Sequence, residues 1–420
     1  MALTLATVNY PAGAGLRRRG AGDSHASMRW LRFAILATPL IAVTTFAKFT
    51  FPPLGAQGID GSLLLLLAAP IVGSVMGCVQ IEPRRLALYV ILLAILGSFQ
   101  ILQTDVSWSS MVLLVALHLP YIFAVPGEGD GNRIIKFFID IVTVFAWLGI
   151  AQYALQFVVS ARFLFPLENF VPSTFIVQHF NKQAALAYGS EVYRANGVFL
   201  LEPSFFSQVL AVAIVAELGN LRRITRLVPF GIAILASHSG TGLLLLAVCL
   251  PLYLVSRRHW NLLLIGLIAL VAIIAFQDLL HLDRFVSRLD EFGSTRSSGF
   301  ARFVGGFFLF DQYLWGDPWR TLFGYGAGAF ADYSARSDYP VAEMALFKIV
   351  FEFGLAGAAA YFGFLFCCLI ASPAPRLLIL AVALTYLLNG IYTPFAHGLA
   401  LSLVLWNSAP AGPMPAKAES

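Results

Sequence analysis

Charged residues are scarce in this chain of 420 residues. Asp, Glu, Lys and Arg make up 12% of the sequence, hydrophobic residues make up 59%, and the mean hydropathy is +0.80. Soluble domains carry about twice that share of charge, so the composition excludes a soluble protein. The net charge of +5 comes mostly from arginines that we expect to face the cytoplasm, and it gives no indication of a nucleic-acid partner.

Cysteine and metal-binding patterns are scarce too. The four cysteines, Cys78, Cys249, Cys367 and Cys368, fall inside apolar segments. This position excludes an extracellular disulfide framework and favours small buried side chains. The seven histidines are scattered, and no His, Cys or Asp cluster has the spacing of metal ligands. We therefore expect neither a metal nor a cofactor.

Two other patterns are missing from the sequence. It has no internal repeat and none of the two-halves symmetry that many transporters show. The first 30 residues include three arginines at 17–19, but no short apolar core followed by a small-residue cleavage site. We interpret residues 1–30 as a disordered cytoplasmic tail rather than a signal peptide.

Long apolar runs are what the chain has in abundance. Each is long enough to cross ~30 Å of hydrocarbon as a helix. Continuous runs such as GSLLLLLAAPIVGSVMG differ from the short alternating segments of a β-barrel. We predict an all-α polytopic membrane protein with about twelve (10–12) transmembrane helices. The expected spans are 31–51, 61–79, 86–103, 107–125, 134–159, 199–218, 227–237, 240–256, 261–276, 344–370, 377–391 and 397–408.

The distribution of arginine and lysine predicts the orientation of these spans. If the N-terminal tail is cytoplasmic, the inward connections hold Arg84 and Arg85, Arg133 and Lys136, Arg222, Arg223 and Arg226, and Arg257 and Arg258. The short outward connections near 52–60, 104–106 and 392–396 contain no Lys or Arg, as the positive-inside rule requires. We expect one transmembrane domain, 31–408, in the bacterial inner membrane, with a second cytoplasmic tail at 409–420.

A break inside one apolar segment completes this topology. Arginines flank residues 227–255 at both ends, so both ends should face the cytoplasm. Two short helices broken at SHSGTG (237–242) satisfy this condition, because irregular backbone at membrane depth needs protein or a watery cavity around it. The polar residues of the break either cap the two half-helices or also line a polar site: Ser237, His238, Ser239 and Thr241.

Two long connections, 160–198 and 277–343, are expected to face the periplasm and to contain short interfacial helices. The second holds six arginines and nine of the 22 acidic residues, and a loop so long and so charged is usually functional. Within it, residues 300–315 place the apolar residues Phe300, Phe303, Val304, Phe307, Phe308 and Leu314 roughly on one helical face. We expect this helix to lie in the membrane interface, with Trp315 and Trp319 as anchors.

The stretch RANGVFLLEPS (194–204) places Arg194 and Glu202 at the outer end of a predicted span. Pro203 fits a first helical turn, so Glu202 lies near the N-cap, where the helix dipole favours a carboxylate. This is the structural interpretation. The functional one makes Glu202 a base and Arg194 an anion clamp. GYGAGAF (324–330) lacks the flanking strand and helix of a nucleotide loop, and we interpret it as a tight-turning loop.

Four motifs in order carry a resemblance to a known family. They are Arg194-x-x-Gly197-x-Phe-x-x-Glu202-Pro203-Ser204, Ser237-x-Ser239-Gly240-Thr241-Gly242, Gly324-x-Gly326-x-Gly328-x-Phe330 and Glu352-Phe-Gly354-Leu-Ala-Gly357. With the long outer loop, residues 130–400 resemble the Wzy-type polysaccharide polymerase and O-antigen ligase superfamily. The resemblance implies a GT-C-like fold and an inverting, metal-independent glycosyltransferase. It also implies undecaprenyl-diphosphate-linked glycans as substrates at the periplasmic face.

The resemblance and the charge inventory together suggest a site. Arginines at the interface would stabilise the diphosphate leaving group, and a carboxylate would accept the proton of the acceptor hydroxyl. The candidates for the diphosphate clamp are Arg194, Arg302 and Arg296, with Arg302 also expected in catalysis. Glu202 and Glu343 are the candidate bases. Ser239, Glu352 and His397 are expected to support the site.

Polymerase and ligase are distinguished by one position. Ligases of the superfamily resemble one another in a His-Asn pair that is followed by nine residues and then Gly-x-x-Gly; here Glu343-Met344 stand at the position of the pair. This departure weakens the ligase interpretation. His397 lies near the outer end of the last span as a helix-end residue or a catalytic partner. Glu352 and Lys348 have the i,i+4 spacing of an ion pair, which is either structural or a support for the site.

We therefore predict a polymerase that joins lipid-linked repeat units into exopolysaccharide, capsule or O-antigen. A ligase that moves finished glycan onto a lipid or protein acceptor is the alternative, and a lipid-linked glycan flippase or transporter is the third. A transporter would place charged residues along a path through the spans, whereas the charge here is concentrated in the outer loops. The expected partners are membrane lipid, the growing polysaccharide, and chain-length regulator and export proteins.

Overall fold

The computed structural model describes residues 19–51, 59–101, 103, 106–127, 130–178, 180–186, 189–221, 223–275 and 297–407. This part of the chain is mostly helical, with two short antiparallel strand pairs. The longer helices are α1 (Arg19–Thr44), α2 (Gly61–Val75), α3 (Pro83–Ile101), α4 (Trp108–His118), α5 (Gly131–Leu155), α8 (Pro203–Ala216), α9 (Ile224–Ser237), α10 (Gly240–Ser256), α11 (Trp260–Ala275), α17 (Ala345–Ile370) and α18 (Arg376–Leu387).

Several α-helices are followed directly by a 3-10 or π-helical segment. A 3-10 turn, η1 (Leu119–Ile122), follows α4, and a π-turn, η3 (Glu217–Leu221), follows α8. Helix α19 (Pro394–Leu399) continues into the π-helix η4 (Ala400–Leu405). The strand pairs are β1 (Thr50–Phe51) with β2 (Ile59–Asp60) and β3 (Gln80–Ile81) with β4 (Phe123–Ala124).

Three described helices are long and apolar enough to cross a membrane: α3, α5 and α17. They coincide with the expected spans 86–103, 134–159 and 344–370. Seven shorter apolar helices of 10–17 residues coincide with the expected spans 61–79, 107–125, 199–218, 227–237, 240–256, 377–391 and 397–408. A mostly helical chain with three such helices is consistent with an all-α membrane protein; the number twelve stays a prediction.

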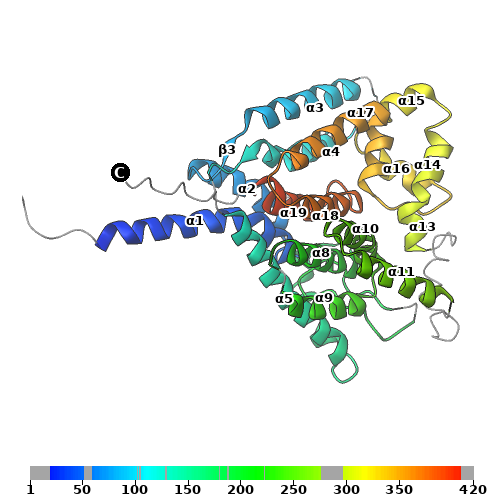
Figure 1. Cartoon of the computed structure of the whole chain (residues 1–420). Helices are drawn as coiled ribbons and strands as arrows, with labels where there is room; N and C mark the ends of the chain where they lie inside the picture. The colour runs from blue at the N-terminus through cyan, green and yellow to red at the C-terminus, as the bar shows by residue number, and fades with distance from the viewer. Residues whose placement is uncertain are drawn as a thin grey trace, which may run out of the picture.

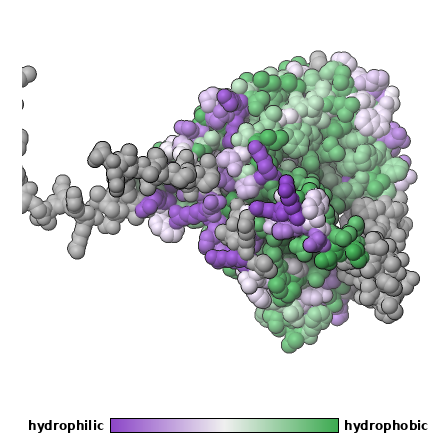
Figure 2. Space-filling model, viewed as in Figure 1, coloured by the Kyte–Doolittle hydropathy of each residue, from purple (hydrophilic) through white to green (hydrophobic). Residues whose placement is uncertain are grey.

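The helices form two groups around a shared centre (Figure 1). Helices α3, α4 and α17 lie in one group, and α5, α8, α9 and α10 lie in the other. Helices α18 and α19 lie between them. Helix α1 projects from one side, whereas the short helices of the 277–343 connection lie at the opposite side. Hydrophobic side chains cover much of the face seen in Figure 2, and hydrophilic ones gather toward the α1 side.

The first helix departs from the expected tail. It begins at Arg19, so residues 19–30 are helical instead of disordered. No proline stands between Arg19 and the apolar run, and a helix extends at little cost once its first turn exists. Residues 1–18 and 409–420, the rest of the expected tails, lie outside the described part of the chain.

Helix α8 lies at the centre of its group because it is apolar on all sides. All fourteen residues from Pro203 to Ala216 are buried, as is typical of a helix without a polar face. Its few polar side chains find partners: Ser207 Oγ accepts from the backbone N–H of Gly242, and Gln208 Oε1 accepts from Asn389 Nδ2 at 2.7 Å. Helix α8 therefore carries Glu202, directly before its first turn, on a rigid support.

The predicted break at residues 237–242 is confirmed. Helix α9 ends at Ser237, His238 adopts a left-handed conformation with φ of 44°, and α10 begins at Gly240. The polar side chains of the break bond locally, since Ser237 Oγ donates to the carbonyl of Ile234 and His238 Nε2 lies 3.0 Å from the Tyr153 hydroxyl. The break thus ends one helix, begins the next and packs against α8 through hydrogen bonds to Ser204 and Ser207.

Both long connections contain short helices, as expected. The first holds α6 (Ala161–Leu164), α7 (Pro166–Phe170) and the 3-10 turn η2 (Ser173–Phe175), and the second holds α13 (Ser298–Phe303), α14 (Gly305–Tyr313), α15 (Pro318–Phe323) and α16 (Ala329–Arg336).

The single helix predicted over 300–315 is wrong. The chain bends at Val304, and α13 and α14 are separate helices with different faces. A Cβ on Gly305 would lie 2.2 Å from the carbonyl oxygen of Pro340, and one on Gly306 would lie 2.2 Å from the ring of Phe347. The two glycines therefore let the chain turn against α17. Phe300 is buried by this turn, whereas Phe307, Phe308, Trp315 and Trp319 stay exposed.

Candidate functional site

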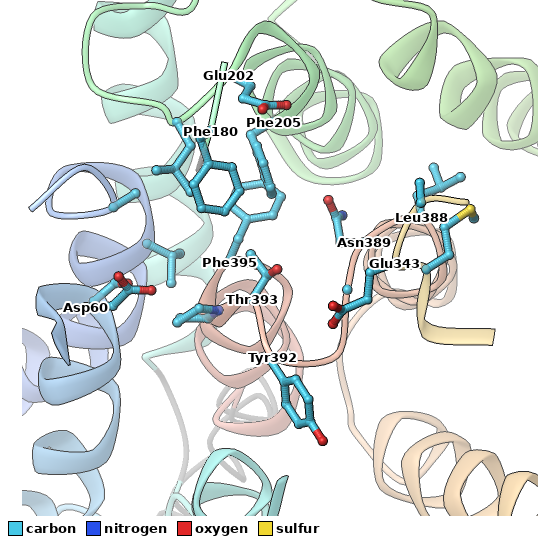
Figure 3. A pocket seen from close by; sticks show the side chains of 18 of the residues that line it. Asp60, Phe180, Glu202, Phe205, Glu343, Leu388, Asn389, Tyr392, Thr393 and Phe395 are labelled. Atoms are coloured by element: carbon cyan, nitrogen blue, oxygen red, sulfur yellow. The ribbon is translucent and has the colours of Figure 1, made fainter. Parts of the chain in front are cut away.

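A pocket of about 540 Å³ opens where segments far apart in the sequence meet. It is lined by the start of α2, the start of α8, the helix α13, the residues before α17 and the connection between α18 and α19. Figure 3 shows Asp60 and Glu343 on opposite sides of this pocket, with Glu202 near Phe180 and Phe205. A pocket with aromatic walls and a few converging polar groups is typical of a ligand site.

Backbone hydrogen bonds fix the segment that carries Glu343. The N–H of Ala342 donates to the carbonyl of Ala301 in α13 at 2.8 Å, and the N–H of Ala345 donates to the carbonyl of Asn389 after α18 at 2.9 Å. These bonds tie residues 342–345 to both neighbours. As a result, the arginine of α13 and the carboxylate of Glu343 line the same pocket.

Glu202 occupies the N-cap position of α8, with Pro203 in the first turn, as the sequence predicted. Its side chain makes no capping hydrogen bond and turns outward instead. Oε1 accepts from the backbone N–H of Asn181 at 2.8 Å, and Oε2 accepts from Ser204 Oγ at 3.1 Å. Both oxygens therefore have protein donors, which hold the carboxylate at the edge of the pocket.

Arg302 is the guanidinium group of the pocket. It lies in α13, and its side chain is 28% exposed. Its Nη2 lies 4.0 Å from Glu202 Oε2, which is at the limit for an ion pair. Burial lowers the pKa of the Arg302 guanidinium, and Glu202 opposes that shift; arginine nevertheless stays charged in proteins. A half-buried cation with such a distant partner can take up an anionic ligand.

Glu343 borders the pocket beside a buried cation. Its carboxylate is 41% exposed, and its Oε1 lies 3.3 Å from the ammonium of Lys348. The position is reached because the chain enters α17 at Ala345, so that Glu343 is still outside the helix. Glu202, Arg302 and Glu343, three of the residues predicted from the sequence, thus line one pocket.

Aromatic rings form one wall of the same pocket. Phe180 and Phe205 meet edge to face at 5.9 Å, and Phe205 and Phe395 do so at 4.8 Å. The rings come from the 160–198 connection, α8 and α19. They present apolar surface next to the carboxylates, an arrangement that can hold the apolar faces of an otherwise polar ligand.

Asp60 is a pocket residue that the sequence reasoning missed. It stands at the N-cap position of α2 and lines the pocket. The signal that could have found it is the one used for Glu202, an acidic residue at the outer end of a predicted span. Asp60 is thus a third carboxyl group that lines the pocket. Burial raises its pKa.

The raised pKa of Asp60 predicts a pH-dependent stability. Burying an ionised carboxylate costs free energy, so the protonated form of Asp60 is favoured in the folded protein. Its contribution to stability is fully present below the ordinary pKa of 3.8 and is lost as the pH rises through the pKa that Asp60 has in the folded state. We expect Asp60→Asn to raise the unfolding temperature at pH 7.5 by on the order of 1–3 °C. The gain should vanish near pH 4, measured by tryptophan fluorescence in detergent. The exposed Asp311→Asn is the control, and a lower unfolding temperature at pH 7.5 would contradict the assignment.

Two other predicted residues lie away from this pocket. Arg194 Nη2 donates to the carbonyl of Leu186 at 3.0 Å within a turn of the 160–198 connection, and Arg194 does not line the pocket. Ser239 Oγ lies 3.1 Å from Thr241 Oγ1 in the break between α9 and α10, and it does not line the pocket either. Arg296 lies outside the described residues. Within the described part of the chain, Arg302 is therefore the one predicted clamp residue that lines the pocket.

His397 and Glu352 lie behind the pocket. His397 is fully buried: its Nε2 lies 2.8 Å from the carbonyl of Ile391, and its Nδ1 lies 3.1 Å from the hydroxyl of Tyr121. It belongs to a buried group with His118, Tyr361 and Tyr386. This position fits a structural helix-end residue. Glu352 is 0% exposed and pairs with Lys348 at 3.3 Å, so the predicted i,i+4 pair is confirmed.

The four sequence motifs pack as two pairs. A Cβ on Gly242 would lie 2.3 Å from the carbonyl oxygen of Ser207, so the second motif approaches α8 directly after the first. In the other pair, Gly324 and Gly354 face each other's backbones, with φ of 74° and 67°. The first motif contributes Leu201 and Glu202 to the pocket, and Glu343 stands nine residues before the fourth motif.

The kink at Gly354 explains how the second pair holds together. It interrupts the helical hydrogen bonding of α17, which makes carbonyls near it available to other donors. The N–H of Tyr325 donates to the backbone carbonyl of Phe351 at 3.0 Å, and the N–H of Gly326 donates to the backbone carbonyl of Glu352 at 2.8 Å. The predicted tight turn in GYGAGAF is thus confirmed, and its backbone is bonded to the kink.

Among the described residues, no three His, Cys, Asp or Glu side chains form a group that could hold a metal ion. In the comparisons with known proteins, no family model matches the chain, and no curated protein matches its sequence.

Proposed function

We propose that the chain is a membrane glycosyltransferase that joins lipid-diphosphate-linked oligosaccharides into a polysaccharide. The observation that carries the proposal is the pocket in which Glu202, Arg302 and Glu343 converge from three separate segments. It combines a cation for a leaving phosphate, carboxylates for proton transfer and an aromatic wall. The resemblance to the Wzy-type polymerase and O-antigen ligase superfamily, given above, supports the same reaction.

In this proposal, Arg302 stabilises the leaving diphosphate. The bond between the anomeric carbon and the diphosphate oxygen breaks, and the electron pair leaves with the phosphate. A guanidinium group can meet the developing charge with two parallel hydrogen bonds, and such preorganised donors are typically a large contribution to catalysis. The 4.0 Å separation from Glu202 supports this role, because Arg302 has no shorter carboxylate contact among the described residues.

Glu343 is the proposed base. The acceptor hydroxyl attacks the anomeric carbon and passes its proton to the carboxylate, which must lie within hydrogen-bond reach. Glu202 already accepts hydrogen bonds at both oxygens, whereas Glu343 is more exposed and borders the pocket. Glu202 then serves as a positioning group for Arg302. Glu343 stands where ligases of the superfamily have a histidine, which supports polymerisation over ligation.

The proposed setting is the bacterial inner membrane, with about twelve crossings and both termini in the cytoplasm. The pocket then faces the periplasm beside the two long connections. Undecaprenyl-diphosphate-linked repeat units would reach it from the outer leaflet, with the exposed rings of Phe307, Phe308, Trp315 and Trp319 at the interface. Chain-length regulator and export proteins would act on the polymer.

A reconstitution experiment tests the function. Purified protein in nanodiscs, given one defined lipid-diphosphate-linked oligosaccharide with EDTA and no nucleotide, should produce a ladder of products that differ by one repeat unit. Electrophoresis of the labelled glycan measures the ladder. A single transfer onto an added lipid or protein acceptor would indicate the ligase instead. Movement of the substrate between leaflets without a new bond would indicate a flippase.

A further inference from the structure

Lys348 lies between two carboxylates of different surroundings. Its ammonium is 3.3 Å from Oε1 of Glu343, which borders the pocket, and 3.3 Å from Oε1 of Glu352, which is 0% exposed. The Lys348 side chain is itself only 3% exposed. Aromatic rings enclose the ammonium: the ring centre of Tyr392 lies 4.5 Å away, and that of Phe330 lies 5.6 Å away. Glu343, Lys348 and Glu352 are called the Glu–Lys–Glu triad below.

The charge of the triad does not balance. Two carboxylates share one ammonium, so one negative charge remains when all three groups are ionised. In a site of low dielectric constant, an uncompensated charge is costly. The cost falls when one proton is added, because the triad then becomes neutral. The exposed member, Glu343, is the carboxylate that a proton from the pocket can reach.

We propose that Lys348 and Glu352 are positioning residues of the pocket. The ammonium of Lys348 compensates the charge of Glu352 as well as that of Glu343, so Glu343 is only partly compensated and remains able to accept a proton. This inference rests on the proposed function and assigns a role to the buried pair behind the pocket. Capture of the acceptor's proton by Glu343 brings the triad to neutrality. Lys348 also fixes the direction of the Glu343 carboxylate, since it contacts one of its oxygens and leaves the rest of the group toward the pocket.

Other titratable groups face the triad from the neighbouring elements. Tyr392, from the connection before α19, lies close enough to both glutamates for their charges to act on its hydroxyl. Across the pocket are Asp60 from the start of α2, Glu202 from the start of α8 and Arg302 from α13. From α16, the neighbour is the uncharged Phe330. None of them stands between Lys348 and its two carboxylates, which are in direct contact with it.

The pH profile of polymerisation tests the proposal with two opposite changes. Glu352→Gln leaves the ammonium to Glu343 alone, so the acidic midpoint of the profile should move down by about one pH unit. Lys348→Met leaves Glu343 next to a like charge, so the midpoint should move up by about the same amount. Glu343→Gln should abolish the ladder. Lys136→Met, which removes the lysine of the i,i+4 pair with Asp140 on α5, should leave the profile unchanged.

A second measurement does not depend on activity. Lys348→Met strands two carboxylates, one of them fully buried, and should lower the unfolding temperature. Adding Glu352→Gln removes the buried charge and should recover much of that loss. If the double variant is no more stable than Lys348→Met, or if both midpoints stay at the wild-type pH while the ladder persists, the proposal is overturned. If the wild-type protein makes no ladder, the proposed function fails, whereas the stability measurement still shows whether the triad shares its charge.

Discussion

Arg302→Ala should reduce polymerisation by roughly 100- to 1000-fold while leaving the fold intact. The reason is that, within the described part of the chain, Arg302 is the guanidinium that lines the pocket, so its loss removes the cation proposed for the leaving diphosphate. Stability should change little, because the side chain is partly exposed and its ion pair with Glu202 is long at 4.0 Å. The ladder assay measures the rate, and the unfolding temperature measures the fold.

Two variants make this result specific. Arg302→Lys keeps a positive charge but loses the two-pronged geometry, so its rate should fall between those of the wild type and the alanine variant. Arg336→Ala, at the exposed end of α16, removes an arginine of the same connection outside the pocket and should polymerise normally. An Arg302→Ala protein that makes the wild-type ladder would remove this residue from the site.

Gly354→Ala should destabilise the protein by roughly 3 kcal/mol or more. Two effects add. Gly354 has φ of 67° and ψ of −174°, a backbone conformation that residues with a side chain rarely adopt. In addition, a Cβ would lie 2.3 Å from the carbonyl carbon and oxygen of Leu322, which are backbone atoms that cannot turn aside. The expected result is a lower unfolding temperature and a larger aggregated fraction in size-exclusion chromatography.

Gly363→Ala is the matched control in the same helix. Gly363 is exposed in α17, and a Cβ there would meet nothing within 4 Å. At an exposed helix position, alanine stabilises the helix by up to about 1 kcal/mol relative to glycine, so this variant should be at least as stable as the wild type. Equal losses in the two variants would mean that the kink at Gly354 is not what the substitution disturbs.

The helices could be predicted from the sequence because their signals are local. Most of the apolar runs and the break at 237–242 were predicted close to their observed positions. One local prediction was wrong, since the apolar face over 300–315 suggested one helix and the chain has two. The bend there depends on Gly305 and Gly306 packing against Pro340 and Phe347, which no pattern within the segment records.

The candidate site was only partly predictable, because local signals do not record which distant residues pack together. Charge at the outer ends of spans indicated Glu202, and the long charged connection together with the family resemblance indicated Arg302 and Glu343. Sequence signals could not show that Arg194 bonds to Leu186 away from the pocket. Asp60 carries the same sequence signal as Glu202, but its place in the pocket depends on the tertiary structure.

By itself, the sequence determined the helical membrane class, the order of the helices and the residues with suitable chemistry, because periodicity, length and charge act over a few turns of chain. Only the tertiary structure decided which of those residues share a pocket. Arg302 and Glu202 are 100 positions apart, and Asp60 is further still from Glu343. Their distances are set by how α8, α13 and α17 pack, and packing depends on side chains that lie far from one another in the sequence.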